Sequence, residues 1–247
     1  MDISLDELKI IANKEKFNLI FLEKDYLLTY LLYLIKDVKG IYFKGGTALN
    51  KIFLNHERLS EDLDFTLTKK LSDVEKEIKN KLKNTIFKKI THDKRVENFA
   101  RLIVHYKLFH ENGTIFIDLN KRAELLLKPQ KIKIPNFYKE FIPEFDINCL
   151  NQKEIIAEKI MATCERYKPR DYFDLYFIIK NNLPISISLI KKKFKKNKKE
   201  FTIGLLFKKT NKIFNEWNDD LFKLTKTNPS FHEIMKTLKK FFKYKEK

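Results

Sequence analysis

A glycine pair near the middle of the first half of the chain could bind phosphate. Gly45 and Gly46 lie between Lys44 and Thr47, after a short apolar stretch and before a helical pattern. Backbone N–H groups in such a turn, at the start of a helix, favour an anion, and the Thr47 hydroxyl could add a donor. The spacing is not that of a Walker A loop. The simpler alternative is a tight turn that needs only a positive φ angle.

An acidic pair follows soon after the glycines. In a strand over residues 62–67, Asp62 and Asp64 would share one face with Thr66, while the apolar residues between them enter the core. Two neighbouring carboxylates repel each other unless a cation lies between them, and Mg²⁺ held by carboxylates and substrate phosphates meets that need. Asp118, in a later predicted strand, could be a third metal ligand or a turn residue at the strand end. The alternative for the pair is the solvated face of an edge strand.

Arginine is rare in this chain, and its positions are therefore informative. Only 6 Arg stand beside 45 Lys. Arg58, two residues before Ser60 and close to the acidic pair, and Arg166 and Arg170 downstream lie in the segments suspected of binding a nucleotide. Because lysine is the default cation here, these positions suggest that the planar guanidinium is needed.

A third group of charged residues lies far downstream. Lys159 and Arg166 are seven residues apart, so they share a helix face, and Pro169 then ends the helix. Asp171 and Asp174, three residues apart, project in similar directions from the next helix. These residues could contact a triphosphate and complete a catalytic site. They could equally be a helix cap, its ion partner and a surface lysine.

The charge of the chain is unevenly distributed. Net charge is +18, and residues 180–247 hold 19 Lys against 6 acidic residues, a surplus of +13. The densest tract, KKKFKKNKK at residues 191–199, should continue a helix with a basic face. Such a region suggests a polyanionic partner such as RNA. The alternative is a compositional bias towards Lys, Asn, Ile and Phe, as A+T-rich genomes produce.

The hydrophobic pattern places these motifs on an α/β scaffold followed by helices. Strands are expected over residues 41–44, 62–67, 101–109 and 114–119, and the last two should form a hairpin. Residues 128–143, which include three prolines, are expected to form an irregular connector. Helices are expected over residues 4–16, 19–38, 47–54, 72–84, 152–167, 171–181, 188–199, 201–217 and 229–244. This order predicts a domain with a mixed sheet over residues 1–145 and a helical domain over residues 146–247, the latter contributing Lys159 and the Asp171/Asp174 pair to the site.

Composition limits the class of protein. With 43% hydrophobic residues and only two cysteines, the chain is expected to be globular, without a disulfide framework. The N-terminus lacks a basic segment followed by an apolar core, and no apolar run reaches the roughly 20 residues of a membrane span. We therefore expect a cytoplasmic protein that does not enter the membrane.

Two blocks of the sequence resemble the AbiEii/AbiGii-type nucleotidyltransferase toxins. The first runs from Phe43 to Leu49 and on through the segment from Arg58 to Phe65, and the second runs from Glu158 through Arg166 to Tyr176. The resemblance covers roughly residues 40–180, with compatible motif order. The lysine-rich tail shows no resemblance that can be named.

The resemblance implies a fold like that of DNA polymerase β, followed by a helical region, and a toxin of a toxin–antitoxin or phage-abortive system that is opposed by an antitoxin protein. Members transfer nucleotides from an NTP to RNA, in some cases to the 3′ end of tRNA, which blocks translation. By position, Gly45, Gly46 and Thr47 would hold phosphates. Asp62 and Asp64 would bind Mg²⁺. Lys159 would contact the triphosphate, and Asp171 or Asp174 would complete the site.

Two other functions remain compatible with these residues. The same site could transfer a nucleotide to a protein hydroxyl. Alternatively, the chain could be an inactive nucleic-acid-binding module. The acidic pair and Lys159 favour an enzyme over the second alternative.

Overall fold

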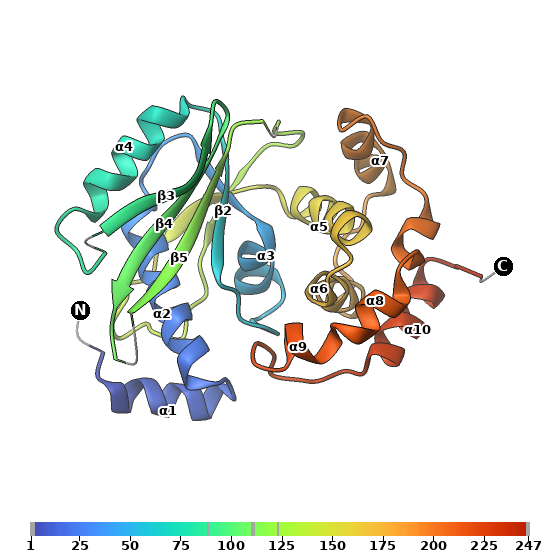
Figure 1. Cartoon of the computed structure of the whole chain (residues 1–247), viewed down its shortest axis with the longest axis horizontal. Helices are drawn as coiled ribbons and strands as arrows, with labels where there is room; N and C mark the ends of the chain where they lie inside the picture. Colours follow the sequence, from blue (N-terminus) through green and yellow to red (C-terminus); the bar gives the residue numbers. More distant parts are fainter. Residues whose placement is uncertain (1–2, 88, 110–111, 123, 246–247) are drawn as a thin grey trace. The chain divides into compact units, whose positions relative to one another are not determined.

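A seven-stranded mixed sheet forms the first of two structural units. The computed structural model describes residues 3–87, 89–109, 112–122 and 124–245 (Figure 1). The chain divides into two compact units, Met1–Asn151 and Gln152–Lys247. The first unit contains α1 (Leu5–Glu15), α2 (Leu19–Ile35), β1 (Ile41–Lys44), α3 (Gly45–Ala48), a π-helical turn (Leu49–Phe53), β2 (Asp62–Leu67), α4 (Leu71–Leu82), β3 (Lys89–Val96), β4 (Phe99–Lys107), β5 (Asn112–Asn120), β6 (Gln130–Lys133) and β7 (Asp146–Cys149).

The order of strands in this sheet places the acidic strand at its centre. The order is β3-β4-β5-β2-β1-β7-β6. β2 runs parallel to β5 and antiparallel to β1, so hydrogen bonds hold it on both sides. The mixed sheet confirms the predicted fold class. The alternative of a solvated edge strand for Asp62 and Asp64 is wrong, since β2 is the fourth of seven strands.

The core of the first unit follows from the alternation along its strands. Leu63 and Phe65 of β2 are fully buried, as is Phe43 of β1, whose ring centroid lies 5.5 Å from that of Phe65. The long helix α2 is mostly buried, and a buried ion pair joins it to the π-helical turn. Lys51 Nζ lies 2.7 Å from Asp25 Oδ1, and Tyr138 donates to the other oxygen of that carboxylate over 3.2 Å.

Three strands of this sheet were missing from the sequence-based prediction. β3 and β6 are the two edge strands, and their side chains are mostly exposed, so they show no apolar alternation. β6 lies inside the segment 128–143 that was expected to be an irregular connector. It pairs with the short strand β7.

The second unit is helical. It contains α5 (Gln152–Arg166), α6 (Pro169–Lys180), α7 (Ile187–Lys196), a 3₁₀ turn (Ile203–Phe207), α8 (Thr210–Asn215), α9 (Trp217–Leu221) and α10 (Phe231–Phe241). The single helix expected over residues 201–217 is therefore three short elements. The Tyr172 hydroxyl of α6 donates to the Leu206 carbonyl oxygen over 2.8 Å and ties the 3₁₀ turn to α6.

The tract expected to be a basic helix face has a buried member. Lys193 of α7 is 6% exposed, and its Nζ lies 2.8 Å from Glu154 and 2.7 Å from Glu158, both on α5. These contacts fix α7 against α5. The other lysines of residues 191–199 are exposed.

Both cysteines are buried thiols, and no helix of the described ranges is long and apolar enough to cross a membrane. Burial raises the pKa of Cys149 and that of Cys164 to about 12. The Cys149 thiol donates to the Phe43 carbonyl oxygen over 3.1 Å. Both thiols therefore stay protonated and unreactive near neutral pH.

Candidate active site

The glycine turn opens a helix directly after β1. Gly45 has a φ angle of +77°, which an L side chain rarely adopts, and it begins α3. No Lys44 side-chain hydrogen bond caps this helix, so in the described structure the first backbone N–H groups are not satisfied by a cap. The chain continues into a π-helical turn and not into the helix expected over residues 47–54. Uncapped N–H groups of this kind suit a phosphate.

The carboxylate of Asp64 lies against Gly45. Lys44 of β1 pairs with Asp64 of β2, and a β-carbon on Gly45 would come within 2.0 Å of Asp64 Oδ2. Only glycine fits between the turn and this carboxylate. The structure therefore brings together the glycine turn and the acidic strand, which the sequence separates by more than a dozen residues.

Thr47 also links α3 to β2. Its hydroxyl donates to the Asp62 backbone carbonyl, and the side chain is only 2% exposed. The Thr47 hydroxyl proton is thus used inside the protein. Its contribution to the site is to hold β2 beside α3, while its backbone N–H remains part of the first turn.

Asp62 and Asp64 are both half-buried on one face of β2, whereas Leu63 between them is buried. The third residue expected on this face, Thr66, is 1% exposed, and its hydroxyl has no hydrogen-bond partner in the described part of the chain. The polar face therefore narrows to the two carboxylates at the start of the strand.

Asp118 lies in register beside Asp64, but an arginine engages it. Asp118 of β5 and Asp64 of β2 are partners in the parallel ladder, and Arg101 of β4 is the antiparallel partner of Asp118. Arg101 binds both oxygens of Asp118, at 2.6 and 2.7 Å. This hydrogen bonding raises the pKa of the guanidinium, which stays charged. The site thus has a fixed cation that the sequence did not single out.

Several charges act on the Asp62 carboxyl. Burial raises its pKa above the ordinary value, Lys24 lowers it in part, and Glu61 and Asp118 raise it further. Lys24 of α2 is also 3.2 Å from Glu61. A bound cation would stabilise the ionised form of such a carboxyl group.

The predicted nucleotide ligands Arg58 and Ser60 contact each other. Arg58 is 3% exposed and donates to the Leu59 carbonyl and to the Ser60 hydroxyl, each over 2.9 Å. Asn50 donates to the Gly46 carbonyl and accepts from the Arg58 backbone N–H. Arg58 and Asn50 therefore fix the segment that leads from the glycine turn to Asp62.

In the second unit, Lys159, Asp171 and Asp174 form one buried cluster. Lys159 Nζ lies 2.8 Å from Asp171 Oδ1 and 2.7 Å from Asp174 Oδ2, and all three side chains are at most 6% exposed. The second oxygen of Asp171 is buried and has no hydrogen-bond partner in the described ranges. The alternative of a surface lysine is therefore wrong for Lys159, which is buried and paired with both carboxylates.

The two downstream arginines differ in their contacts. Arg166 is largely exposed and lies 3.3 Å from Asp171. Arg170 is paired with Asp220 of α9, which accepts from its backbone N–H and from its guanidinium at 3.0 Å. The Asp220 partner was not predicted, since it lies 50 residues away in the sequence.

The carboxylates of β2 suit a hard cation such as Mg²⁺. Among the described residues, no group of three or more His, Cys, Asp and Glu side chains could hold a metal ion. Mg²⁺ commonly takes one or two carboxylates and fills its remaining positions with water and substrate phosphates. Asp62 and Asp64 beside the glycine turn could meet that requirement, while Arg101 already neutralises Asp118.

Comparison with known proteins agrees with this geometry. A family profile described as the nucleotidyl transferase AbiEii toxin of type IV toxin–antitoxin systems matches residues 27–241. MenT4, a nucleotidyltransferase toxin from Mycobacterium tuberculosis, has a similar structure with a TM-score of 0.68 and 17% identity, over 98% of this chain and 89% of that chain. JHP933 from Helicobacter pylori has a TM-score of 0.57 and 21% identity, over 92% of each chain.

No curated protein sequence matches the chain. The two structures share its fold, and the family profile covers most of its length, including the glycine turn, the acidic strand and the buried lysine cluster. A family of toxins in such systems implies an antitoxin that opposes them. The chain belongs to the AbiEii family and is a nucleotidyltransferase toxin of a type IV toxin–antitoxin system.

Proposed function

We propose that this toxin transfers a nucleotidyl group from a magnesium-bound NTP to a hydroxyl of RNA, most plausibly the 3′ end of tRNA, and so blocks translation. The observation that supports this proposal best is the contact between the Asp64 carboxylate and Gly45. Carboxylates and a phosphate-binding turn at one position are what a polyphosphate with its cation requires.

The roles of the residues follow from their contacts. Gly45 and Gly46 would offer backbone N–H groups to the phosphates, and Thr47 would keep β2 in place through its bond to Asp62. Asp62 and Asp64 would hold Mg²⁺, which when bound neutralises phosphate charge and makes an attacking hydroxyl more acidic. Arg101 would remain a fixed cation beside them, since Asp118 occupies its guanidinium.

The proposed reaction is a displacement at the α-phosphorus. The acceptor oxygen forms a bond to the α-phosphorus, the bond from that phosphorus to the bridging oxygen breaks, and pyrophosphate leaves. The hydroxyl proton passes to a carboxylate or to water. No redox partner is needed, and catalysis consists of positioning and charge stabilisation.

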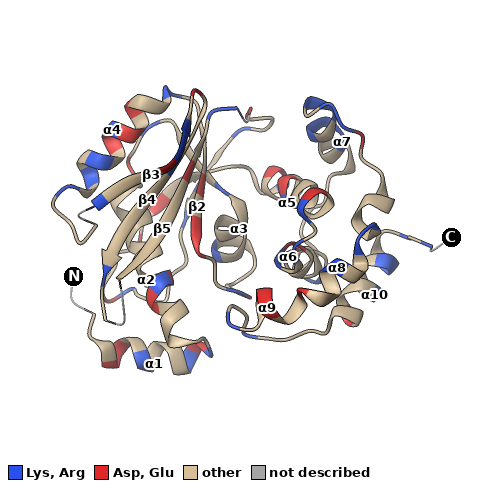
Figure 2. Cartoon of the chain, viewed as in Figure 1, with Lys and Arg blue, Asp and Glu red and all other residues tan. Residues whose placement is uncertain are grey.

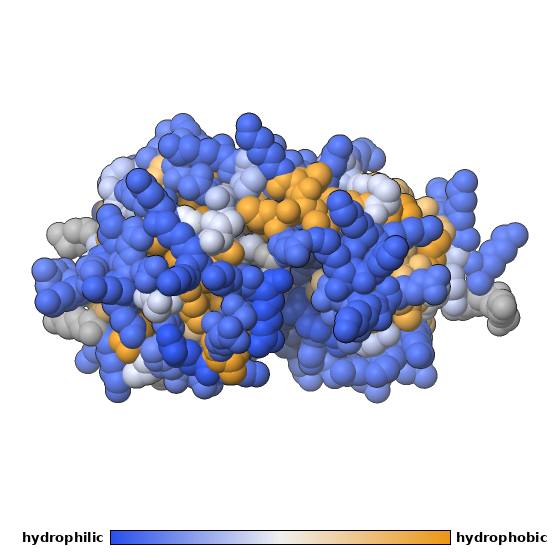
Figure 3. Space-filling view, turned by 90° about the horizontal axis from the view of Figure 1, so that it is seen from above, coloured by the Kyte–Doolittle hydropathy of each residue, from blue (hydrophilic) through white to orange (hydrophobic). Residues whose placement is uncertain are grey.

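Charge favours RNA as the acceptor over a protein side chain. The surplus of +13 over residues 180–247 and the exposed lysines of α7 would attract a polyanion (Figure 2). Hydrophilic residues dominate the surface shown in Figure 3, with smaller apolar patches among them. Nucleotidylation of a protein hydroxyl remains the second candidate, because the carboxylates do not select the acceptor.

The remaining predicted ligands keep their proposed roles. These are Lys44, Arg58, Ser60, Arg166 and Arg170 for the nucleotide, Lys159 for the triphosphate, and Asp171 or Asp174 to complete the site. Their internal contacts mean that each substitution must be read together with a measurement of stability. A residue acts as a nucleotide ligand if its substitution lowers nucleotide affinity by more than the loss of folding stability accounts for.

One experiment tests the proposed function. The purified toxin is incubated with each radiolabelled NTP and magnesium, in parallel with purified tRNA and with total protein. Label on tRNA that depends on Asp64 supports the proposal. Label on protein alone would establish the second candidate, and no label with any NTP, together with no Mg·NTP binding by calorimetry, would leave an inactive nucleic-acid-binding module.

A further inference from the structure

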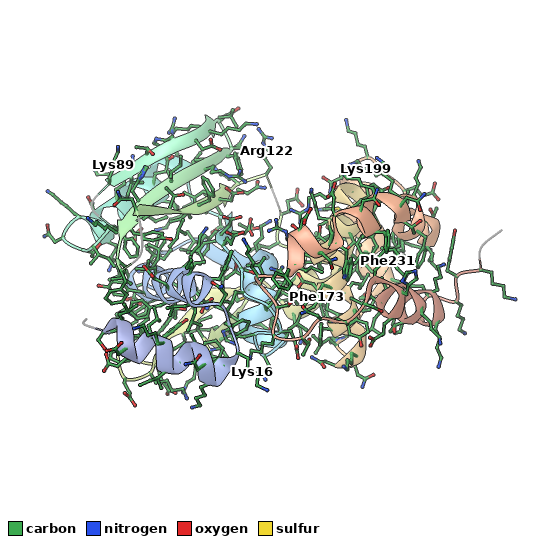
Figure 4. The ribbon with its side chains drawn as sticks, turned by 60° about the horizontal axis from the view of Figure 1, so that its bottom comes forward. Lys16, Lys89, Arg122, Phe173, Lys199 and Phe231 are labelled. Carbon is green, nitrogen blue, oxygen red and sulfur yellow. The ribbon has the colours of Figure 1, made fainter. Side chains whose placement is uncertain are left out.

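A pocket of about 630 Å³ lies within the second unit, apart from the buried lysine cluster. Its walls come from α6, α8, α9, the segment after α9 and the start of α10. Phe173 of α6 and Phe231 of α10, both labelled in Figure 4, line it. The volume is in the range of about 300–1,000 Å³ typical of small-molecule sites. The pocket therefore has room for a base with its sugar.

Aromatic rings make up much of the pocket wall. Phe231 stands at the centre, with ring centroids 5.3 Å from Phe214, 5.5 Å from Trp217 and 5.5 Å from His232, all close to edge-on. Exposed aromatic rings can stack on a further planar group such as a base. The arrangement holds the rings in fixed directions without filling the space between them.

Two of the rings are unusually exposed for their size. Phe214 is 53% exposed and Phe222 is 71% exposed, whereas Trp217 is 8% exposed. Large apolar side chains left in water next to a pocket indicate a binding surface. Trp217 anchors the wall while Phe214 and Phe222 are open to a ligand.

Polar side chains complete the lining. Asn215, Asn218, Asn228 and Ser230 contribute amide and hydroxyl groups beside the aromatic rings. Thr225 donates to Asn228 over 2.8 Å, and the Ser230 hydroxyl accepts from Glu233 N, so the segment before α10 has an ordered shape. Amides and hydroxyls can bond the edges of a base, and rings stack on its faces.

The pocket and the unit around it differ in charge. The described residues that line the pocket include no Lys, Arg, Asp or Glu, so the pocket itself suits an uncharged planar group. Gln152–Lys247 as a whole holds 22 Lys and 2 Arg against 11 acidic residues, a surplus that would attract phosphates outside the pocket. Two acidic residues next to the lining are paired with cations, Glu216 with Lys168 and Asp220 with Arg170.

We infer that this pocket stacks an unpaired base of single-stranded RNA, and that it thereby helps the toxin to hold its acceptor. The inference rests on the proposed RNA acceptor and adds a recognition site for it. Lysines attract the phosphates without regard to sequence, whereas the rings require a base that is not stacked in an RNA duplex. The toxin would thus prefer RNA with an unpaired end or loop to a continuous duplex.

The test uses the full-length toxin and a single-stranded RNA of about eight nucleotides, a length within the site sizes of such proteins. A 3′-terminal phosphate on this RNA prevents transfer, so binding is measured without catalysis. Trp217 is the only tryptophan of the chain and lines the pocket, so its fluorescence reports occupancy. We expect the RNA to quench Trp217, and a blunt RNA duplex of the same length to do so much less.

Phe214→Ala should weaken binding of the single strand about 5-fold or more, since base–aromatic stacking contributes roughly 1–3 kcal/mol. Phe214→Tyr keeps the ring and should retain affinity. Phe241→Ala is the matched control, because Phe241 is 47% exposed in the same unit and does not line the pocket. Phe214 is largely in water, so its truncation should leave the fold intact.

Equal affinity of wild type and Phe214→Ala for the single strand, or equal quenching by duplex, would overturn the inference. So would a Phe214→Ala protein that binds RNA normally but no longer binds the antitoxin, since the pocket would then be a protein-docking site. The binding assay involves no NTP. It can therefore succeed even if the transfer reaction fails, and the two proposals are tested separately.

Discussion

The side chain of Asp64 occupies the space that a β-carbon on residue 45 would need. The separation would be 2.0 Å to Oδ2 and 2.7 Å to Cγ, and the φ angle of Gly45 is +77°. Both the backbone conformation and the contact therefore require glycine. The glycine turn, proposed to bind phosphate, and the Asp64 carboxylate, proposed to bind magnesium, depend on each other for their positions.

Gly45→Ala should abolish nucleotide transfer and destabilise the first unit by roughly 1–3 kcal/mol, because it combines a strained φ with a clash. Thermal unfolding and an NTP transfer assay measure the two effects. Gly204→Ala is the control, since a β-carbon there meets nothing within 4 Å. Activity in Gly45→Ala comparable to that of the control would contradict the geometry described for the turn.

Asp62→Asn and Asp64→Asn should each lower transfer by orders of magnitude and leave the protein folded, because residues that act as a unit in catalysis show such losses. Asp118→Asn should cost less, since Arg101 already holds both oxygens of Asp118. Single-turnover rates of the three variants give the comparison. If all three fall together, Asp118 is a third metal ligand.

The raised pKa of Asp62 predicts a particular pH dependence. An acid whose pKa is higher in the folded state than in the unfolded chain costs stability as the pH rises between these two values. Asp62→Asn should therefore gain stability relative to wild type as the pH is raised from about 3 to 7. Unfolding midpoints of both proteins across this range test the sign, and a difference that does not change with pH would refute it.

The same shift should appear in activity. Transfer should fall on the acid side at a higher pH than an ordinary aspartate would give, because protonated Asp62 cannot hold a cation. Raising the magnesium concentration should move this loss to lower pH, since the ion favours the carboxylate. A pH–rate profile at two magnesium concentrations provides the measurement. If the acid limb of the profile stays at the same pH at both concentrations, Asp62 does not bind the metal ion.

Lys159→Met should destabilise the second unit by about 3–5 kcal/mol, because the buried carboxylates of Asp171 and Asp174 would lose the cation that contacts them both. A triple variant, in which Asp171→Asn and Asp174→Asn are added, should recover most of that loss. Denaturant unfolding gives the stabilities. If the triple variant is folded and still binds Mg·NTP as tightly as wild type, Lys159 has no role at the triphosphate.

Reversing the exposed lysines of α7 and the turn after it (Lys191, Lys192, Lys195 and Lys198) to Glu should weaken RNA binding and reduce its salt dependence, by about 0.7 in the log–log slope per lost phosphate contact for a single strand. Lys193 must be retained, because it is buried between two glutamates of α5. The control reverses four exposed lysines of α4 and the residue after it (Lys76, Lys79, Lys81 and Lys83). If the two sets of substitutions weaken RNA binding equally, the tract contributes only through the overall charge of the protein.

The sequence was sufficient to predict elements whose side chains alternate between core and site. In β2, buried Leu63 and Phe65 flank Asp64, and this alternation alone placed the carboxylates on one face. Edge strands β3 and β6 lack that pattern because one of their faces and one of their edges meet water. Their formation depends on the neighbouring strand, which a local pattern does not encode.

Contacts that depend on register or on distant helices could not be predicted. The pairing of Arg101 with Asp118 requires the alignment of β4 with β5, and that of Arg170 with Asp220 spans 50 residues. Lys193 looked like one more surface lysine in a basic tract. Its burial follows from Glu154 and Glu158 on another helix, which draw it into the interior.

The two shielded thiols make this toxin convenient for site-specific spectroscopy. Cys149 and Cys164 should resist maleimide reagents at neutral pH, so a cysteine introduced on the surface would take a fluorophore or spin label alone. Glu200→Cys, at an exposed position directly after the basic tract, would place a probe there and keep every lysine of the tract. RNA engagement could then be followed in real time on an otherwise unmodified protein.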